Sequence, residues 1–486
     1  MINDDKQVKS RAVTGVIWKL MEKVGMQFMQ FVIQIVLARL LLPEDYGIVG
    51  LLTIFITLSD VFLKQGFTTA LIQKKDADEL DFSSVFIVNI LMAFVIYAIL
   101  FLVSPLVSVF YNEERLTAIM RVLSLNVIVG AFSAVHNAIM SKELEFKKSF
   151  LRSLSSVLTQ GAVGISFAYM GFGVWSLVFS KIAATVVGTV VICATVKWKP
   201  KMMFSLKRLG SLFSFSSNVL FVNLLNTAFN NIHSLIIGRY FHKAELGYYQ
   251  RGQQFPSVMM TAVDGSLNEV IYPTLSKLQD DLGKVKTALR RSMKTSMFLV
   301  MPLLFGMMAV SEDMILVLLT EKWLPCVPYV RLSCIVCAFW PLSARRHALN
   351  ALGLSKITFK LSLISKMMTL VFIFICIPYG IYAIMLGTIF SSSVGVWLTS
   401  YYVSKHIHYS IKEFVLDILP PVIISGIMFV IVSILGQLLT VNVYIKLCFQ
   451  IAAGAALYVG LSKFFNADSF NYVIKMVNGI VKKKGL

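Results

Sequence analysis

The chain has 486 residues, 57% of them hydrophobic and only 14% charged, and its mean hydropathy is +0.76. Soluble domains carry about 25% charged residues, so this composition excludes an ordinary soluble globular protein and predicts a large surface that faces lipid. The net charge of +20, from 45 basic and 25 acidic residues, would suggest nucleic acid in a soluble chain. In a membrane protein it must first be compared with the topology of the loops.

The six cysteines lie almost entirely inside apolar runs. They provide no disulfide framework and no metal site, because the one C-x-x-C, Cys334 with Cys337, has no second pair. The first twelve residues are polar and charged, so we expect no cleavable signal peptide. The sequence also lacks a Gly-rich phosphate loop, so we expect no ATP hydrolysis. We identify no candidate catalytic residue and expect a protein that is not an enzyme.

Fourteen runs are apolar and long enough to cross the hydrocarbon core, which takes about 20 residues of helix. They predict an all-α polytopic membrane protein. The approximate cores of the runs are 14 to 39, 46 to 70, 82 to 110, 116 to 140, 151 to 171, 173 to 196, 212 to 238, 253 to 276, 295 to 319, 326 to 352, 357 to 378, 380 to 403, 415 to 437 and 442 to 463.

The loops between these runs alternate in basic charge. Lysine and arginine are frequent in loops such as 197–208 and 277–294, whereas the loops 43–46, 171–173 and 378–380 are short and carry none. Because basic residues accumulate in cytoplasmic loops, both termini are predicted to be cytoplasmic. Orientation then accounts for most of the positive charge, and nucleic acid is not needed to explain it.

The longest cytoplasmic connection separates the first six spans from the next six. We therefore expect an N-terminal six-helix lobe at 1–196, a basic cytoplasmic linker at 197–211, and a second six-helix lobe at 212–403. Two additional spans and a basic cytoplasmic tail would occupy 404–486.

A weak internal repeat supports the two lobes. Arg39 stands eight residues before Gly47 in LARLLLPEDYG, and Arg239 stands eight residues before Gly247 in IGRYFHKAELG, an offset of about 200 residues. Since the first and seventh spans both start inside, the lobes would be parallel repeats related by an axis along the membrane normal. Transporters are commonly built in this way.

The first span carries five polar side chains whose spacing places them on one helical face: Lys19, Lys23, Gln27, Gln30 and Gln34. Polar groups in hydrocarbon cost several kcal/mol unless they find partners. We therefore expect this face to point into a protein interior or a water-filled cavity. For Lys19 and the neighbouring Glu22, the alternative is that both reach the cytoplasmic headgroups.

Other spans add amides and charges at membrane depth. The seventh span contains Asn223, Asn226 and Asn230, and further ionisable residues in spans include Asp60, Lys64, Asp264, Arg345 and Arg346. The predicted direction of each span puts the basic residues Lys19, Lys23, Lys64, Arg345 and Arg346 in its cytoplasmic half. One cationic, amide-rich vestibule would suit a phosphate-bearing ligand with a hydroxyl-rich head. Amides that only bridge helices are the alternative.

The intramembrane carboxylates have two alternative roles. Glu22, Asp60 and Asp264 are either counter-ions for the cations, or one of them carries a coupling proton. No cofactor is expected beyond a proton or sodium gradient.

The motifs resemble those of the bacterial polysaccharide-unit flippases (Wzx-like), within the multidrug/oligosaccharidyl-lipid/polysaccharide exporter superfamily, and are most similar to the colanic-acid-exporter type. The segments that carry this resemblance are LARLLLPEDYG at 37 to 47, ELGYYQRGQQFPSVMM at 245 to 260, LLTEKWLP at 318 to 325 and NALG at 350 to 353. The resemblance implies a monomeric flippase of the bacterial inner membrane. It would export undecaprenyl-diphosphate-linked oligosaccharide units by alternating access, among membrane lipids. Whether polysaccharide polymerase machinery is a further partner stays open at this point.

Three other functions would each require particular sequence features. A multidrug exporter of the same superfamily should have an acidic, aromatic-lined pocket, and the basic first span is the reverse. An integral-membrane polymerase or ligase normally needs a sizeable outer loop with acid/base residues, which the short outer loops do not provide. A peptidoglycan-precursor flippase differs only in cargo and stays an alternative.

Overall fold

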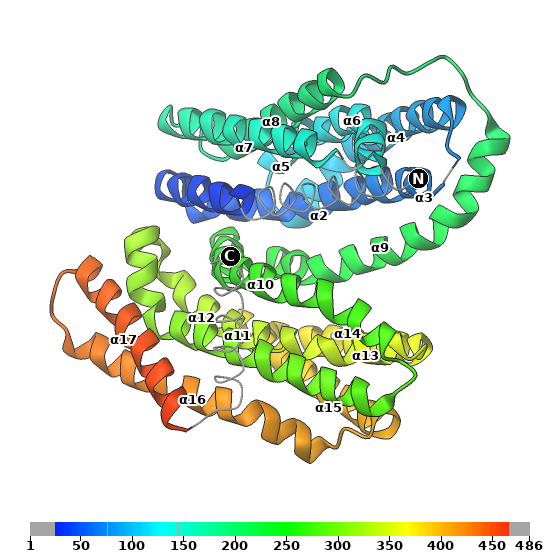
Figure 1. Ribbon diagram of the computed structural model, residues 1–486. Coiled ribbons are helices and arrows are strands. Elements are labelled where there is room, and N and C mark those ends of the chain that lie inside the picture. Colours follow the sequence, from blue (N-terminus) through cyan, green and yellow to red (C-terminus); the bar gives the residue numbers. More distant parts are fainter. Residues whose placement is uncertain (1–24, 75, 144, 466–486) are drawn as a thin grey trace, which may run out of the picture. The chain divides into compact units, whose positions relative to one another are not determined.

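The computed structural model describes residues 25–74, 76–143 and 145–465, and within these ranges the chain is helical and contains no strand (Figure 1). The side chains of residues 65, 146, 214, 215, 218 and 262–270 are not described. The helices are Gly25–Leu40, α2 (Pro43–Gln65), α3 (Phe67–Gln73), α4 (Glu79–Tyr111), α5 (Arg115–Leu123), α6 (Leu125–Lys142), α7 (Phe146–Tyr169), α8 (Val174–Thr195), α9 (Leu206–Tyr240), α10 (Lys243–Lys277), α11 (Leu282–Leu318), η1 (Glu321–Cys326), α12 (Val327–Cys337), η2 (Trp340–Ser343), α13 (Ala344–Ala351), α14 (Ser355–Cys376), η3 (Ile377–Tyr379), α15 (Ile381–Ile407), α16 (Ile411–Leu438) and α17 (Val443–Phe464).

Eleven helical segments of the described chain are long and apolar enough to cross a membrane. Their exposed side chains include large hydrophobic residues such as Leu102, Val109 and Phe374, which are 73%, 75% and 60% exposed. This exposure is what a lipid-facing surface requires. The multi-pass all-α fold is confirmed, whereas the count of fourteen spans is not: Gly25–Leu40 is a shorter apolar helix, and α7 and α10 are not among the eleven.

Helix ends follow local sequence signals. The side chain of Asp78 accepts a hydrogen bond from the Asp81 backbone N–H and caps α4, and Ser410 caps α16 in the same way with Glu413. Pro43 occupies the first turn of α2, where its missing N–H is harmless. At the opposite end of α4, Asn112 takes the left-handed conformation with φ 51°.

The described chain forms two compact units, Met1–Gly247 and Tyr248–Leu486. In the first unit α7 pairs with α8, α4 with α6, and α2 with α9. Small residues permit close approach: a Cβ on Gly188 would lie 2.3 Å from Ser156 Oγ, and one on Gly161 would lie 2.8 Å from Ile33. Such small-residue contacts are typical of helices that associate within a membrane.

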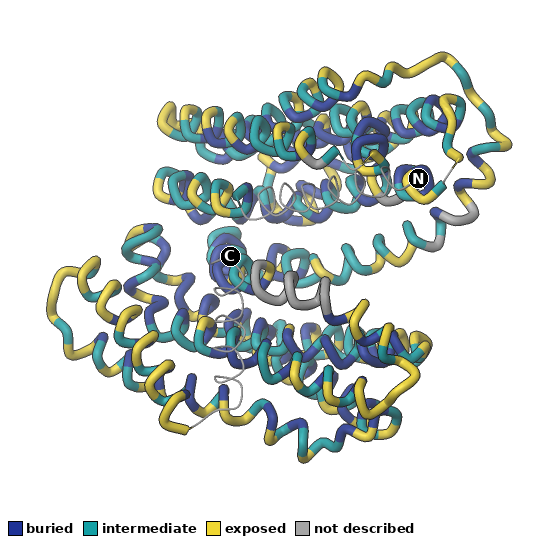
Figure 2. The backbone as a smooth tube through the Cα atoms, in the orientation of Figure 1, coloured by how far each residue is buried: buried dark blue, intermediate teal, exposed yellow. Residues whose placement is uncertain are grey.

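In the second unit α11 packs against α12, α13 and α15 and against the two C-terminal helices α16 and α17. Arg290 of α11 donates two hydrogen bonds to Asp417 of α16, at 2.6 and 2.8 Å. Lys446 of α17 pairs with Asp313 of α11 at 2.9 Å. Figure 2 shows buried and exposed residues alternating along α16 and α17, because each helix packs with one face only. The additional spans are therefore joined to α11 by charge as well as by packing.

The boundary between the units falls after Gly247, near the start of α10, so that α9 belongs to the first unit and packs on α2 and α3. The predicted division into lobes at 197–211 stays a prediction. The segment 197–205, which we call the strap, is extended and has no regular helix. It leads from α8 to α9 (Figure 1).

Candidate functional site

Three charged side chains meet inside the candidate spans of the first unit. On α2, Lys64 Nζ lies 2.7 Å from Asp60 Oδ2, one helical turn away. Lys181 of α8 interacts electrostatically with both residues. Asp60 is thus paired with Lys64, and the ammonium group of Lys181 on a neighbouring helix adds a second positive charge to the same region. We call Asp60, Lys64 and Lys181 the lysine-aspartate cluster.

Helix stability does not explain this cluster. An ion pair one turn apart is worth about 0.3–0.5 kcal/mol, whereas a single Lys or Asp at the centre of a span costs about 2.5–3.5 kcal/mol. The Asp60 and Lys64 side chains are 40% and 59% exposed, so they face water or a ligand more readily than lipid. Such an arrangement is a candidate anion site with one positive charge in excess.

Sequence reasoning selected Asp60 and Lys64 but missed Lys181. The signal was available, since Lys181 is the only charged residue in the run 173 to 196. Periodicity does not select Lys181, because a single lysine in a long apolar helix forms no pattern with neighbouring residues. Only the packing of α8 beside α2 joins it to the other two.

The predicted polar face of the first span is partly described. Lys19, Glu22 and Lys23 lie outside the described residues. Gln27 is half-buried and Gln30 is exposed on the helix Gly25–Leu40. Phe28 and Val32, on the other side of this helix, are 68% and 43% exposed. The helix therefore exposes a polar side and an apolar side, and the cavity expected beside the polar side stays a prediction.

The three asparagines of the seventh span lie on one face of α9 (spacing of three and four residues). Asn223 and Asn226 are half-buried, and Asn230 is exposed. The next residue, Asn231, instead donates to the Thr227 carbonyl at 2.8 Å. An amide that satisfies its own helix is structural, so Asn231 is no ligand candidate in this conformation. Binding by the other three stays a prediction.

The two arginines of α13 have different surroundings. Arg345 is 1% exposed, donates to the Leu342 and Val396 carbonyls at 3.2 and 3.3 Å and to the Ser400 hydroxyl, and lies 4.3 Å from the centre of the Phe414 ring. Its contacts hold α13, α15 and α16 together, so a substrate could reach it only after a rearrangement. Arg346 is half-buried and interacts electrostatically with Lys366 of α14. Lys366 was also missed from the sequence.

Asp264 belongs to α10, and its side chain is outside the described set. Its role in ion coupling stays a prediction, like that of Asp60 and Glu22. In the described part of the chain no group of three or more His, Cys, Asp and Glu residues could hold a metal ion.

The two repeat-related loops of the first unit pack against each other. A Cβ on Gly47 would lie 1.9 Å from the Lys243 carbonyl oxygen, and a Cβ on Gly247 would lie 2.0 Å from the Pro43 carbonyl oxygen. The contact is reciprocal: Gly47 of α2 lies against the carbonyl of Lys243, the first residue of α10, and Gly247 of α10 lies against the carbonyl of Pro43, the first residue of α2. The N-termini of α2 and α10 therefore cross at a distance that only glycine permits. We call this contact the glycine crossing.

An ion network surrounds the glycine crossing. Arg115 donates to Glu44 at 2.6 Å and to Glu113 at 2.7 Å, and Lys243 Nζ lies 3.3 Å from Glu113. Hydrogen bonds from Arg115, and then from Lys243, lower the pKa of the Glu113 carboxyl below its ordinary value of 4.5. The network links the loop before α5 to the starts of α2 and α10.

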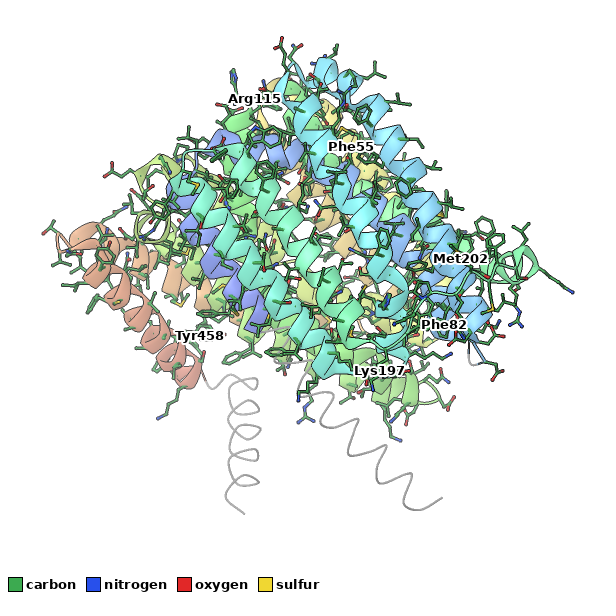
Figure 3. All side chains as sticks on the ribbon, turned by 90° about the horizontal axis from the view of Figure 1, so that it is seen from above. Phe55, Phe82, Arg115, Lys197, Met202 and Tyr458 are labelled. Carbon is green, nitrogen blue, oxygen red and sulfur yellow. The ribbon has the colours of Figure 1, made fainter. Side chains whose placement is uncertain are left out.

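The other end of the first unit holds the strap. Figure 3 shows Phe82 and Lys197 at this end and Arg115 at the opposite one. The backbone N–H groups of Lys201 and Ser205 donate to the hydroxyls of Ser83 and Ser84 at 3.2 and 3.1 Å. Both serines are fully buried at the start of α4. The strap is therefore held on α4 by its backbone.

Charges reinforce this attachment. Lys201 pairs with Glu79 at 2.9 Å, and Arg208, at the start of α9, pairs with Asp78 at 2.9 Å and with Asp81 at 3.3 Å. Backbone hydrogen bonding at the helix cap and the Arg208 guanidinium lower the pKa of Asp78. The predicted basic linker thus lies against an acidic helix start.

Comparison with known proteins agrees with this architecture. The family model described as "Polysaccharide biosynthesis protein" matches residues 36–328. The teichuronic acid biosynthesis protein TuaB of Bacillus subtilis (strain 168) is 24% identical over 420 residues, which are 83% of this chain and 85% of TuaB. The succinoglycan biosynthesis transport protein ExoT of Rhizobium meliloti (strain 1021) is 25% identical over 317 residues, 65% of this chain and 64% of ExoT.

Among solved structures, the lipid II flippase MurJ in an inward closed conformation has the same fold. Its TM-score is 0.76 at 15% identity, over 94% of this chain and 99% of MurJ. The expected all-α polytopic membrane fold is confirmed by this likeness. Because the family model covers more than half of the sequence, the chain belongs to the family of polysaccharide biosynthesis proteins, as its motifs indicated.

Proposed function

We propose that the protein is a flippase that moves undecaprenyl-diphosphate-linked oligosaccharide units across the bacterial inner membrane by alternating access, for capsule, exopolysaccharide or O-antigen synthesis. The single observation that carries the proposal is the lysine-aspartate cluster, with its excess positive charge inside candidate spans. In the second unit Arg346 and Lys366 form another cationic pair. Membership of the polysaccharide biosynthesis family and the names of TuaB and ExoT support the choice of cargo.

The physical task of such a flippase is to bring a diphosphate through a low-dielectric layer. An unpaired anion there is prohibitive, and paired ammonium groups reduce the cost. The lipid chain can stay in the bilayer throughout, so the protein needs to shelter only the headgroup. Lys64 and Lys181 would neutralise phosphate oxygens, while the glutamines of the first helix and the asparagines of α9 would bond sugar hydroxyls.

Asp60 connects substrate binding to an ion gradient in this mechanism. The Asp60 carboxylate pairs with Lys64 at 2.7 Å, and Lys181 interacts with it electrostatically. A diphosphate that draws Lys64 away leaves Asp60 without its paired cation, and the coupling ion would take that place. Proton uptake on substrate binding is the coupling we propose, and a sodium ion replacing the lysines is the alternative.

Orientation follows from the basic loops. We propose that both termini, the strap and the start of α4 are cytoplasmic, and that the glycine crossing lies on the outer side. In the conformation described here the glycine crossing is closed. The N-termini of α2 and α10 would have to separate when the substrate leaves toward the outside.

Reconstitution tests the proposal. Proteoliposomes would contain an undecaprenyl-diphosphate oligosaccharide with a fluorescent sugar, and flipping would be followed as protection from a membrane-impermeant quencher. Loss of one charge-assisted contact should slow flipping about tenfold or more, so Lys181→Gln and Lys64→Gln are each expected to do so. Lys463→Gln, an exposed lysine at the end of α17, is the matched control.

Wild-type rates for both cluster variants would refute the role of the lysine-aspartate cluster. Transport of cationic dyes in place of the labelled glycolipid would instead establish the multidrug alternative. Equal rates for a peptidoglycan precursor would leave the flippase mechanism intact and change only the cargo.

A further inference from the structure

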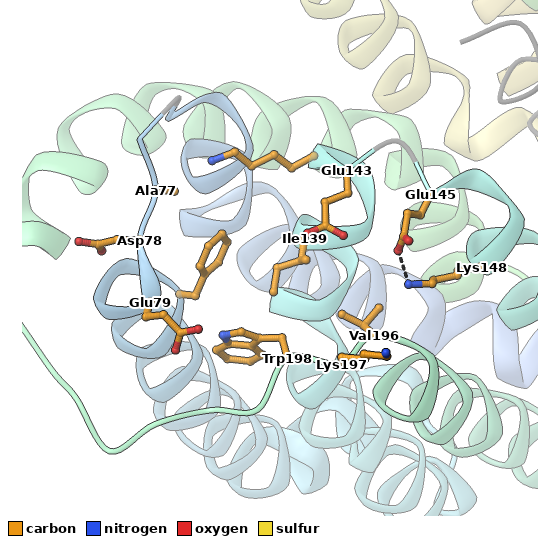
Figure 4. Close-up of a pocket in the computed structure, with 12 residues that line it drawn as sticks. Ala77, Asp78, Glu79, Ile139, Glu143, Glu145, Lys148, Val196, Lys197 and Trp198 are labelled. Carbon is orange, nitrogen blue, oxygen red and sulfur yellow. Dashed lines mark ion pairs between the residues drawn. The ribbon is translucent and has the colours of Figure 1, made fainter. Parts of the chain in front are cut away.

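A pocket of about 930 Å³ opens at the end of the first unit where the strap begins. It is formed by the start of α4, the end of α6, the loop before α7 and the first residues of the strap (Figure 4). Its volume is within the range of about 300–1,000 Å³ that small-molecule sites occupy. The function proposed above makes no use of it.

Most of the charged groups around this pocket are already engaged. Asp78 and Glu79 pair with Arg208 and Lys201, Glu145 pairs with Lys148, and Lys142 donates to the Lys74 carbonyl at 2.8 Å. These contacts hold the walls together and leave little charge for a ligand.

Three polar groups of the lining differ from these. Over residues 25–74, 76–143 and 145–465, no hydrogen bond or ion pair engages the exposed side chains of Glu143 and Lys197. In the same part of the chain the Nε1 of Trp198 is buried without an acceptor. Figure 4 shows Glu143 on the side of the loop before α7, and Lys197 and Trp198 on the side of the strap. One exposed anion and one exposed cation therefore lie around a single space, and one N–H donor without an acceptor is buried in its wall.

The apolar part of the lining indicates where a ligand would come from. Ile139 and Val196 belong to the buried core of the first unit, and Phe82 and Trp198 pack against that core. The pocket lies at the ends of candidate spans, beside loops rich in lysine. Aromatic and basic residues at such a level are typical of the membrane-water interface, where lipid headgroups lie.

We propose that this pocket binds the headgroup of a phospholipid with a primary amine, of the phosphatidylethanolamine class. The phosphate would accept hydrogen bonds from Lys197 and from the indole N–H of Trp198, and the ammonium would donate to Glu143. The acyl chains would extend over the apolar edge formed by Phe82 and Val196.

The charges of the lining discriminate among lipids. Four carboxylates and three ammonium groups surround the pocket, so a purely anionic headgroup meets no excess of positive charge. A quaternary ammonium cannot donate a hydrogen bond to Glu143, which disfavours phosphatidylcholine. A zwitterion with a primary amine fits both requirements, and its binding would fasten the strap at its origin.

The experiment measures the unfolding temperature of the full-length protein in detergent. Dioctanoyl phosphatidylethanolamine, phosphatidylcholine and phosphatidylglycerol are added separately, and glycerophosphoethanolamine and inorganic phosphate serve as lipid-free probes. We expect the largest stabilisation from phosphatidylethanolamine, a smaller effect of the free headgroup at higher concentration, and none from phosphate alone.

The variants assign the contacts. Glu143→Gln should remove the preference for phosphatidylethanolamine over phosphatidylcholine. Lys197→Gln should weaken its binding about tenfold, and Trp198→Phe, which keeps the ring and loses the N–H, should weaken it several-fold. Glu114→Gln and Lys199→Gln alter exposed residues away from the pocket lining and should bind like the wild type.

Equal stabilisation by the three lipids would overturn the proposal, as would an unchanged lipid preference in both Glu143→Gln and Lys197→Gln. If phosphate alone reproduced the whole effect, the site would be a phosphate site and the lipid would be excluded. Because Lys197→Gln and Trp198→Phe are read by lipid response within each variant, a general loss of stability cannot imitate the expected result. The outcome is independent of the flipping assay.

Discussion

The glycine crossing permits a quantitative test of the packing argument. An alanine at Gly47 would place its Cβ 1.9 Å from the Lys243 carbonyl oxygen and 2.7 Å from the carbonyl carbon. Since the obstructing atoms are backbone, no side chain can rotate to relieve the clash, and the two helix starts must separate. Overpacking usually costs about 1–3 kcal/mol, and we expect Gly47→Ala to be at the upper end.

The reciprocal change gives a stronger test than either variant alone. Gly247→Ala meets the Pro43 carbonyl oxygen at 2.0 Å and should cost a similar amount. Once one alanine has separated the helices, the second should add little, so the double variant should be less destabilised than the sum of the two. Gly130→Ala, in α6 with no atom within 4 Å of its Cβ, is the matched control and should be neutral or slightly stabilising.

The assay is thermal unfolding of purified protein, recorded for the four variants beside the wild type. A loss of ~3 kcal/mol corresponds to roughly 5 °C or more in Tm for a unit of this size. Unchanged Tm values for Gly47→Ala and Gly247→Ala would refute the close crossing. Strict additivity in the double variant would refute the shared contact even if both single variants were unstable.

Three further predictions concern stability and the strap. The pKa of Glu113 is lowered in the folded protein, so the carboxylate stabilises the fold above its ordinary pKa of 4.5, and this stabilisation is lost as the pH falls through the lower folded value. Tm measured from pH 7 to pH 3 should therefore fall less steeply for Glu113→Gln than for the wild type. Parallel curves would contradict this. Asp417→Ala removes the buried carboxylate that pairs with Arg290 and Lys294 and leaves Arg290 with Glu413 only; it should cost about 3 kcal/mol. Lys284→Ala breaks an exposed pair and keeps the Asp281 cap of α11, so it should cost at most about 1 kcal/mol. Denaturation curves of the two variants compare them directly. Replacing Ser83 and Ser84 together by alanine removes the hydrogen-bond acceptors for the strap backbone and should accelerate proteolysis within 199–204. A cleavage rate equal to that of the wild type would show that the charges alone hold the strap.

Much of the candidate site could be approached from the sequence, and the exceptions have a common cause. Asp60 and Lys64 stand one helical turn apart, so periodicity suffices to join them. Lys181 is more than a hundred residues away from both and has no local partner. Arg345 was selected as a substrate ligand because it is basic and lies in a span, but its stacking on Phe414 and its bond to Ser400 arise from helices that follow much later in the chain.

The sequence alone determined that the chain is a helical multi-pass membrane protein and indicated the polysaccharide biosynthesis family, because hydropathy, helical spacing and the short motifs are properties of neighbouring residues. It also indicated the repeat of the loops that contain Gly47 and Gly247. Only the tertiary structure decided that these two loops touch, that the strap is bound to α4, and that Lys181 interacts with Asp60 and Lys64. These contacts join residues far apart in sequence, and their energy depends on distances that only helix packing sets.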